Sequence, residues 1–467
     1  MYVKQIYTGC LNEAAYFIES NGEAVVIDPM RDTSVYLQLA QEQNATIKYI
    51  FETHLHSHFV SGHLDLGKAT GATIVYGPGT EARFKFHSAT DGETLKVGAI
   101  SFEVLHTPGH TIESTSYLLR DEQGNPHSLF SGDTLSIEDA ANYDLSSQTF
   151  SKEELASMLY DSIQNKIIPL PDELIIYPAH ISSLSTSGKP GEEISSTLGI
   201  QKKTNHALQI QSKEEFIKSV TENIQDPLPY YNKNVKINKE GYQNLDDVKQ
   251  KGLSPLTLPD FKRKMTEGCI VLDTRTATEF TNEFIPGSIF IGLEGHFAEW
   301  AAMLLSFEEP IIFIAPKGKE EETVIRLARV GFENAEGYLK GGFEDWKEAG
   351  EKIDMIVDIE ADELAMDLPF DEALMVLDVR KPIEFAEGHI KDAVNIPLGD
   401  MVDLAQLASI EENQNIYVHC AAGYRSVIAA SLLKRQGYHN LRNVLGGYNK
   451  IVEEKSIVIE KDASLLN

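Results

Sequence analysis

The chain has 467 residues and a formal net charge of -30, and its acidic residues are scattered along its length. This length favours about three domains. So acidic a chain is a poor partner for nucleic acid or for an anionic membrane surface, and it has no run of about 18 apolar residues that could span a membrane. We therefore expect neither nucleic acid nor a membrane as a partner.

The cysteine content indicates a reducing environment. Only Cys10, Cys269 and Cys420 are present, too few and too far apart for a disulfide framework. The segment 1–7 lacks the apolar core of a signal peptide. Together these features predict cytoplasmic localisation.

The N-terminal part of the chain is rich in metal-binding side chains. β-like apolar runs occur at 24–29 and 47–51, and the second leads into the stretch 54–59, His-Leu-His-Ser-His-Phe. Two related stretches follow, His-Thr-Pro-Gly-His-Thr at 106–111 and Phe-Ser-Gly-Asp-Thr at 130–134. Closely spaced imidazole and carboxylate groups are typical of metal sites. We expect a metal centre in this half of the chain.

The segment Asp-Pro-Leu-Pro-Tyr-Tyr at 226–231 and the polar residues after it predict a linker that ends the first domain. Beyond residue 270 the chain repeats itself with a constant offset of 105 residues. Leu-Asp-Thr-Arg at 272–275 returns as Leu-Asp-Val-Arg at 377–380, and the Gly-Gly pair at 341–342 returns at 446–447. A constant offset indicates duplicated domains, and the apolar runs predict a small parallel α/β sheet in each.

The second copy contains the features of a reactive thiol. A buried-strand pattern leads directly into Cys420-Ala-Ala-Gly-Tyr-Arg425-Ser, and a helical pattern follows. Backbone amides in such a loop point inward and, with the helix N-terminus and Arg425, favour a thiolate and hold an anion. We predict Cys420 and Arg425 as catalytic residues, and the residues that shape the loop are Gly423, Asp378 and Arg380.

The first copy lacks these groups. Ala315 stands at the position of Cys420, and Glu320 stands at the position of Arg425. Without a nucleophile and an anion-binding cation, this copy is predicted to be structural.

The loop that begins at Cys420, with Asp378-Val-Arg and Gly388-His-Ile upstream, resembles the rhodanese family of sulfurtransferases. Related phosphatases have a loop one residue longer, so the four residues between Cys420 and Arg425 favour sulfur transfer over phosphoryl transfer.

The N-terminal motifs resemble the persulfide dioxygenase branch of the metallo-β-lactamase superfamily, and the layout resembles bacterial fusions of that enzyme with two rhodanese domains. The resemblance implies an α/β multidomain fold. Residues 1–240 would form an αββα sandwich with dioxygenase activity. Doubly wound α/β domains of the rhodanese type would occupy 254–353, without a catalytic cysteine, and 358–467, with Cys420.

In this superfamily the pattern at 54–59 is His-x-His-x-Asp-His, and its last two residues serve a second metal. Here those positions are His58 and Phe59. The resemblance therefore implies a single metal held by His54, His110 and Asp133. Two imidazoles and one carboxylate are the ligand set of non-haem iron(II) oxygenases. We expect one Fe(II) per chain, with zinc as an alternative.

For three further histidines the resemblance allows more than one role. By the resemblance, His56 is a residue beside the metal or a weak fourth ligand. His58 is either a solvated imidazole or, with His180, a ligand of an additional metal.

Two departures from the family pattern are close to the metal motifs. Asn142 stands where the family has an arginine, and Ser187 stands where the fusion enzymes have the cysteine of a Cys-Gly-Lys segment. A cation and a thiol are therefore missing, and metal binding is better supported than turnover.

The resemblance implies oxidation of a small-thiol persulfide by O2 to sulfite. It also implies sulfur transfer through Cys420 that makes or uses thiosulfate, both in sulfide detoxification, and a homo-oligomer. Two alternatives remain. One is a sulfurtransferase or sulfur-relay protein with an impaired first domain, consistent with Asn142 and Ser187. The other is a zinc thioester hydrolase resembling hydroxyacylglutathione hydrolase, which Phe59 counts against.

Overall fold

The computed structural model describes residues 1–137, 149–180, 194–222, 227–411 and 413–462. The chain divides into two compact units. The first contains Met1–Asp247 and Leu327–Glu333, and the second contains Val248–Arg326 and Asn334–Asn467. Within the described residues, no helix has both the length and the apolar content needed to cross a bilayer.

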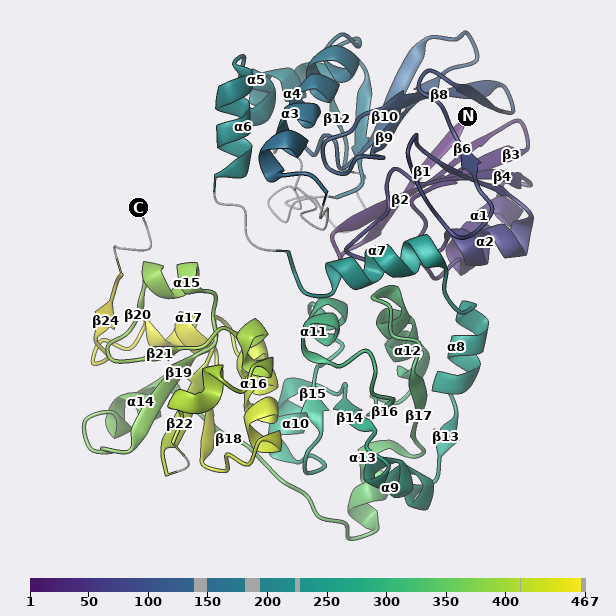
Figure 1. Cartoon of the computed structure of the whole chain (residues 1–467). Helices are drawn as coiled ribbons and strands as arrows, with labels where there is room; N and C mark the ends of the chain where they lie inside the picture. Colours follow the sequence, from purple (N-terminus) through teal and green to yellow (C-terminus); the bar gives the residue numbers. More distant parts are fainter. Residues whose placement is uncertain (138–148, 181–193, 223–226, 412, 463–467) are drawn as a thin grey trace. The chain divides into compact units, whose positions relative to one another are not determined.

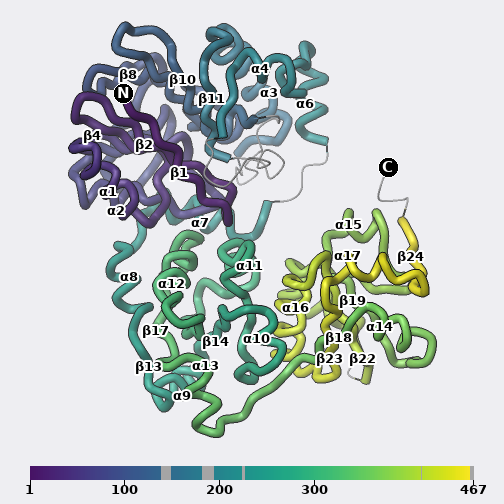
Figure 2. The backbone as a smooth tube through the Cα atoms, turned by 180° about the vertical axis from the view of Figure 1, so that it is seen from behind, coloured from purple at the N-terminus to yellow at the C-terminus, as the bar shows by residue number. Residues whose placement is uncertain are grey.

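Two six-stranded sheets build the first unit. Figures 1 and 2 show this unit from opposite sides. The first sheet has the order β1 (Tyr2–Thr8), β2 (Glu13–Ser20), β3 (Glu23–Ile27), β4 (Thr46–Phe51), β5 (Thr73–Tyr76), β6 (His87–Ser88). The second has the order β12 (Ser196–Thr197), β11 (Ile175–Pro178), β10 (Pro126–Gly132), β9 (Thr115–Arg120), β8 (Ile100–His106), β7 (Thr94–Val97).

The two sheets pack face to face, because the strands alternate apolar residues on both faces. Tyr16 on β2 belongs to the core shared with Phe130 on β10, whereas its neighbour Phe17 points to the opposite face. That outer face packs against α1 (Ser34–Glu42) and α2 (His63–Thr70). The predicted αββα sandwich is confirmed.

The outer face of the second sheet is covered by helices on its own side. Leu118 and Leu129 pack there against side chains of the helical layer. That layer consists of α3 (Lys152–Ser162), a π-helical turn (Ile163–Ile167), α4 (Leu198–Thr204), α5 (His206–Gln209) and α6 (Lys213–Thr221).

The polar residues after 231 form a helix, not the predicted linker. They make up α7 (Tyr231–Glu240), which belongs to the first unit. Its Asn234 donates to the carbonyl of Ser57 at 2.9 Å, and its Asn238 donates to the carbonyls of His56 and Phe59, both at 2.8 Å. The sequence pattern was misleading because these buried asparagines bind backbone groups and not solvent.

The second unit contains two parallel sheets with the same strand order. The first is β13 (Pro255–Leu256), β17 (Ala335–Leu339), β16 (Ile311–Ile314), β14 (Ile270–Asp273), β15 (Ile289–Phe290). The second is β18 (Val357–Ile359), β23 (Leu441–Val444), β22 (Asn415–His419), β19 (Leu374–Asp378), β21 (Val394–Asn395). The matching order confirms that the repeat is a duplicated α/β fold.

Helices alternate with the strands of both copies. In the second copy, α14 and α17 pack on one face through Val376 and Tyr417, while α16 packs on the other face through β22 and β23. The helices of the first copy are α9 (Leu258–Thr266), α10 (Ala277–Asn282), α11 (Phe297–Leu304), α12 (Glu320–Arg329) and α13 (Gly342–Glu348), preceded by α8 (Leu245–Gly252). Those of the second are α14 (Ala361–Asp367), α15 (Pro382–Glu387), α16 (Tyr424–Arg435) and α17 (Gly447–Ile451), with 3-10 turns Leu398–Val402 and Gln406–Ser409 and a small pair β20 (His389–Ile390) and β24 (Ile459–Glu460).

Candidate functional site

The loop after β4 is held by Asp28, the residue that follows β3. Its carboxylate accepts hydrogen bonds from the Thr53 backbone N–H at 2.8 Å and from the Thr53 hydroxyl at 2.9 Å. The same hydroxyl lies 3.0 Å from Nδ1 of His54. Since Nδ1 has this neighbour, Nε2 of His54 is the atom left to bind a ligand.

His54, His110 and Asp133 meet at one point. Nε2 of His54 lies 3.7 Å and Nε2 of His110 lies 3.4 Å from Oδ2 of Asp133. All three residues are buried, and their donor atoms lie within 4.8 Å of one another. Nε2 of His54 has no hydrogen-bond partner in the described part of the chain. Separations of this size suit atoms that share a metal at bonds of about 2.0–2.2 Å.

The protonation states also fit a ligand set. Burial lowers the pKa of His54 well below its usual value, which leaves a neutral imidazole. Burial would raise the pKa of Asp133, but His180 and His110 hold it well below the usual value. Neutral imidazole and ionised carboxylate are the forms that bind metals.

His180 lies between two carboxylates. Its Nδ1 contacts the two oxygens of Asp133 at 2.7 and 2.6 Å, and its Nε2 lies 2.9 Å from Oε2 of Glu13. Glu13 is fully buried, and burial raises its pKa to about 7 although His180 acts in the opposite direction. His180 can therefore orient the Asp133 carboxylate, while Glu13 orients His180.

His56 contacts a second pair of buried carboxylates. Its Nε2 lies 3.1 Å from Oδ1 of Asp28 and 3.4 Å from Oε2 of Glu52. Glu52 also lies 3.6 Å from Nδ1 of His63. Burial would lower the pKa of His56, but Asp28 and Glu52 raise it well above the usual value. An imidazolium between two carboxylates accounts for this arrangement.

His58 and Phe59 occupy the positions that serve a second metal in the superfamily pattern. The ring of His58 lies 4.4 Å from that of His180 and 4.5 Å from that of Tyr231. Phe59 is fully buried, with its ring 4.4 Å from His56. Among the described residues, His58 belongs to no group of three converging ligands. Positions 142 and 187, where the sequence departs from the family pattern, lie outside the described residues.

Cys420 follows β22 and is 1% exposed. The backbone N–H of Gly423 donates to its Sγ at 3.1 Å, from a φ of 105° that favours glycine. A Cβ on Gly447 would lie 2.3 Å from the carbonyl oxygen of Cys420. The N–H of Tyr448 donates to that carbonyl at 2.7 Å. The repeated Gly-Gly motif thus allows α17 to approach the cysteine loop closely.

Asp378 and Arg380 form an ion pair of 2.6 Å in which both side chains are buried. Arg380 also donates to the carbonyl of Gly388 at 2.7 Å, and its guanidinium lies 3.7 Å above the ring of Tyr448. The pair thereby joins β19 to the segments on either side of the cysteine loop.

Arg425 makes a bidentate ion pair with Glu384, with distances of 2.7 and 2.8 Å. The arginine lowers the pKa of Glu384. Burial lowers the pKa of His419, so this buried neighbour of Cys420 is neutral. A dianion entering the loop would therefore compete with Glu384 for the guanidinium.

The first copy keeps the scaffold of this site. Arg275 pairs with Asp273 at 2.7 Å, and its guanidinium lies 4.0 Å above the ring of Phe343. At the loop itself, Ala315 and Glu320 replace the cysteine and the arginine. The first copy therefore keeps the ion pair and the contact of the guanidinium with an aromatic ring, but it lacks the thiol and the loop arginine.

Four acidic residues of these sites were missed by the sequence reasoning: Glu13, Asp28, Glu52 and Glu384. The first three are buried carboxylates at strand ends, and no spacing rule distinguishes them from surface acids. Glu384 had a usable signal, because it lies at the capping position of α15, where it accepts from the Lys381 N–H at 3.0 Å.

Two family models match the chain. The metallo-beta-lactamase superfamily model matches residues 8–180, and the rhodanese-like domain model matches residues 257–349 and 360–454. The first match extends from β2 to β11 of the αββα sandwich, and the second includes four of the five strands of each parallel sheet in the second unit.

Curated relatives include mitochondrial persulfide dioxygenases ETHE1. The mouse protein is 30% identical over 44% of this chain and 74% of its own length. The human protein is 32% identical over 34% of this chain. The chain spans 59% of the human protein, less than two thirds. Hydroxyacylglutathione hydrolases are also among the relatives.

A solved structure, a metallo-β-lactamase from Staphylococcus aureus subsp. aureus COL, is 29% identical with a TM-score of 0.64. The likeness covers 73% of this chain and 99% of that one, so it extends beyond the αββα sandwich. The chain therefore belongs to the metallo-β-lactamase superfamily, as a relative of the persulfide dioxygenases that carries two rhodanese-like domains.

Proposed function

We propose that this chain oxidises a low-molecular-weight thiol persulfide to sulfite at a mononuclear iron(II) centre and transfers sulfur through a persulfide on Cys420. One observation carries the proposal: His54, His110 and Asp133 converge in a buried group, while Phe59 removes a ligand that a second metal requires. Two imidazoles and one carboxylate suit non-haem iron(II). The similarity to persulfide dioxygenases supports the substrate class.

The oxidation balances as RSSH + O2 + H2O → RSH + SO3²⁻ + 2 H⁺. The bound iron would supply a site at which the terminal persulfide sulfur and O2 meet. Asp133 would be held in its binding orientation by His180, which Glu13 holds in turn. The buried ring of Phe59 and the half-buried ring of His58 would restrict water on the side where a second metal would otherwise lie.

The transfer step balances as Cys–S–SH + SO3²⁻ → Cys–SH + S2O3²⁻, and it can run in either direction. The N–H of Gly423 points at Sγ of Cys420 and would stabilise the negative charge on sulfur at the start and end of the step. Sulfite, the product of the first reaction, is the acceptor in the second. This chemical continuity explains why the two activities share a chain.

We assign the oxidation to residues 1–240, no chemistry to 254–353, and sulfur transfer to 358–467. The substrates would be a small-thiol persulfide, O2 and sulfite or thiosulfate, in a cytoplasmic homo-oligomer.

The metal can be tested directly on protein purified without added metal. We expect about one iron per chain in the parent and almost none in Asp133→Ala, because the only carboxylate of the proposed triad is lost. Asp121→Ala is the matched control, since Asp121 lies in the surface turn between β9 and β10 and accepts hydrogen bonds from Gln123 and Asn125 of that turn. Zinc in place of iron, with thioester hydrolysis, would support the hydrolase alternative. Protein without any metal would support the sulfur-relay alternative.

A further inference from the structure

The cysteine loop of the second copy is in contact with the first copy. Tyr424, the first residue of α16, lies between Gly423 and Arg425, and its hydroxyl donates to the carbonyl of Gly292 at 2.8 Å. The Tyr424 ring also meets Phe290 edge to face, with 6.1 Å between centroids. The residue beside the amide that points at the sulfur is therefore anchored on the copy that has no cysteine.

The carbonyl that receives this hydrogen bond belongs to a well-held segment. Arg326 of α12 donates to the next carbonyl, that of Leu293, at 2.6 Å, and is itself paired with Glu322 at 2.7 Å. The N–H of Leu293 donates to the carbonyl of Thr274 at 3.2 Å. The anchor point is thus fixed to the sheet and to a helix of the first copy.

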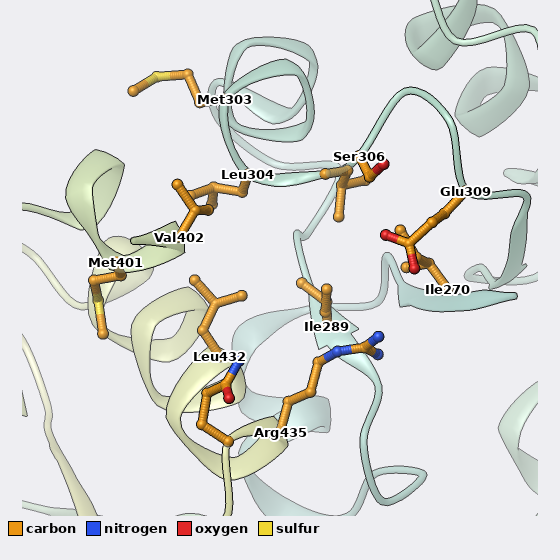
Figure 3. A pocket seen from close by; sticks show the side chains of 12 residues that line it. Ile270, Ile289, Met303, Leu304, Ser306, Glu309, Met401, Val402, Leu432 and Arg435 are labelled. Carbon is orange, nitrogen blue, oxygen red and sulfur yellow. The ribbon is translucent and has the colours of Figure 1, made fainter. Parts of the chain in front are cut away.

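Farther along α16 the contact is less complete. Ser431 accepts a hydrogen bond from the N–H of Phe290 at 3.0 Å. Beyond it lies a cavity of about 410 Å³ whose walls come from both copies, including Ile289, Met303 and Leu432 (Figure 3). At this end of α16 the two copies leave a space between them, whereas at its start Tyr424 is in direct contact with Phe290 and Gly292.

We propose that the first copy is a positioning element for Cys420, which acts through the hydrogen bond from Tyr424 to Gly292. By holding the start of α16, this bond keeps the N–H of Gly423 directed at Sγ, so that less conformational freedom is lost when the sulfur becomes charged. This role explains why a copy without a thiol retains its scaffold. It rests on the proposed sulfur-transfer function, but it can be measured without that activity.

The test removes one hydroxyl. In the full chain with Cys10 and Cys269 replaced by serine, Cys420 is the only thiol, and its alkylation rate by iodoacetamide can be followed against pH. For Tyr424→Phe we expect the midpoint of this profile to rise by about half a pH unit and kcat/KM for sulfur transfer to fall about tenfold. Tyr438→Phe is the matched control, because the Tyr438 hydroxyl donates to carbonyls of its own copy, those of Leu407 and Ile410. Unchanged alkylation in Tyr424→Phe, or an equal shift in Tyr438→Phe, would overturn the proposal.

A variant in the first copy separates the proposed effect from a local disturbance of the cysteine loop by Tyr424→Phe. Arg326→Gln loosens the segment that carries Gly292 while every residue of the second copy keeps its identity, and we expect it to shift the alkylation profile in the same direction. If both residues act through one contact, the double variant is no worse than Tyr424→Phe alone. Effects that multiply, or no effect of Arg326→Gln, would refute a role for the first copy. Absence of sulfur transfer in the parent would instead contradict the proposed function, while the alkylation profile would still decide this inference.

Discussion

Glu13 is linked to the proposed ligand Asp133 through His180. It is fully buried beside Nε2 of His180, whose Nδ1 contacts the Asp133 carboxylate. Hydrogen-bond partners of this kind commonly affect metal affinity by about 10- to 100-fold. The charge of Glu13 is therefore expected to matter for the metal, although Glu13 does not belong to the triad.

We predict that Glu13→Gln weakens iron(II) binding about tenfold above pH 7, where Glu13 is ionised, because the glutamine keeps the shape but not the charge that holds His180. Competition with a chelator measures the effect without turnover. Glu19→Gln, on the same strand, is the control, since the Glu19 carboxylate accepts a hydrogen bond from the N–H of Gly22, in a surface turn away from His180. Equal iron affinity in parent and Glu13→Gln would show that His180 orients Asp133 unaided.

Glu384 gives a prediction for pH. Arg425 lowers the pKa of Glu384 below its ordinary 4.5, so the pair stabilises the folded chain above that pH and loses its effect as the pH falls through the lowered value. Glu384→Gln should reduce the free energy of unfolding by about 1 kcal/mol at pH 7, and this loss should shrink as the pH falls through the lowered pKa of Glu384. Urea unfolding at a series of pH values measures this. Glu387→Gln, an exposed position on the same helix, should have no such effect, and a pH-independent loss in Glu384→Gln would exclude the ion pair as its cause.

At this scale the sequence led to the predicted metal ligands through the resemblance of their motifs to a family, and to Cys420 through the loop that begins there. It could not indicate their partners. Glu13 and Asp133 are 120 positions apart in the sequence, and a buried carboxylate leaves no periodic pattern. Arg425 was expected to hold an anion, but its pairing with Glu384 depends on where α15 begins.

At the scale of secondary-structure elements, the Gly-Gly motif before α17 can be compared with its counterpart in the first copy. Gly447 has a φ of 57°, and a Cβ there would lie 2.3 Å from the carbonyl oxygen of Cys420. Its counterpart Gly342 has a φ of 70°, but a Cβ there would meet nothing within 4 Å. The backbone strain of a substitution is similar at both positions, whereas the clash exists only at Gly447.

We therefore predict that Gly447→Ala abolishes most sulfur transfer, because the alanine pushes α17 away from the cysteine loop. Gly342→Ala should cost only about 1 kcal/mol of stability, from the left-handed backbone, and leave sulfur transfer unchanged. Sulfurtransferase assays and thermal unfolding of the two variants make the comparison. Equal loss of activity in both would mean that backbone strain, not the close approach to Cys420, explains the glycine.

The repeat predicts that the two copies share one fold, because the constant offset of 105 residues carries β14, β15 and β16 onto β19, β21 and β22. The helix α7 could not be predicted from the sequence. Its polar pattern resembles a solvated linker, and only the fold shows that Asn234 and Asn238 bind the carbonyls of residues 56–59. The contact of Tyr424 with Gly292 could not be predicted either, because contacts between domains leave no periodic pattern in the sequence.

For the whole molecule we predict two separable activities. Cys420→Ser should abolish thiosulfate:cyanide sulfur transfer and leave oxygen uptake intact, because serine is a far weaker nucleophile. Asp133→Ala should abolish oxygen uptake and leave sulfur transfer intact. Parallel assays of both variants test this division. Loss of both activities from either substitution would contradict independent sites.

The central claim concerns the reaction at His54, His110 and Asp133, and oxygen consumption tests it most directly. Cys420→Ser chain loaded with iron(II) is given a small-thiol persulfide, and O2 uptake and sulfite are measured together. The account predicts equal amounts of O2 consumed and sulfite formed. The Asp133→Ala variant of the same chain should consume no O2 and form no sulfite. Iron bound at the site without oxygen uptake, or uptake that persists in Asp133→Ala, would contradict it.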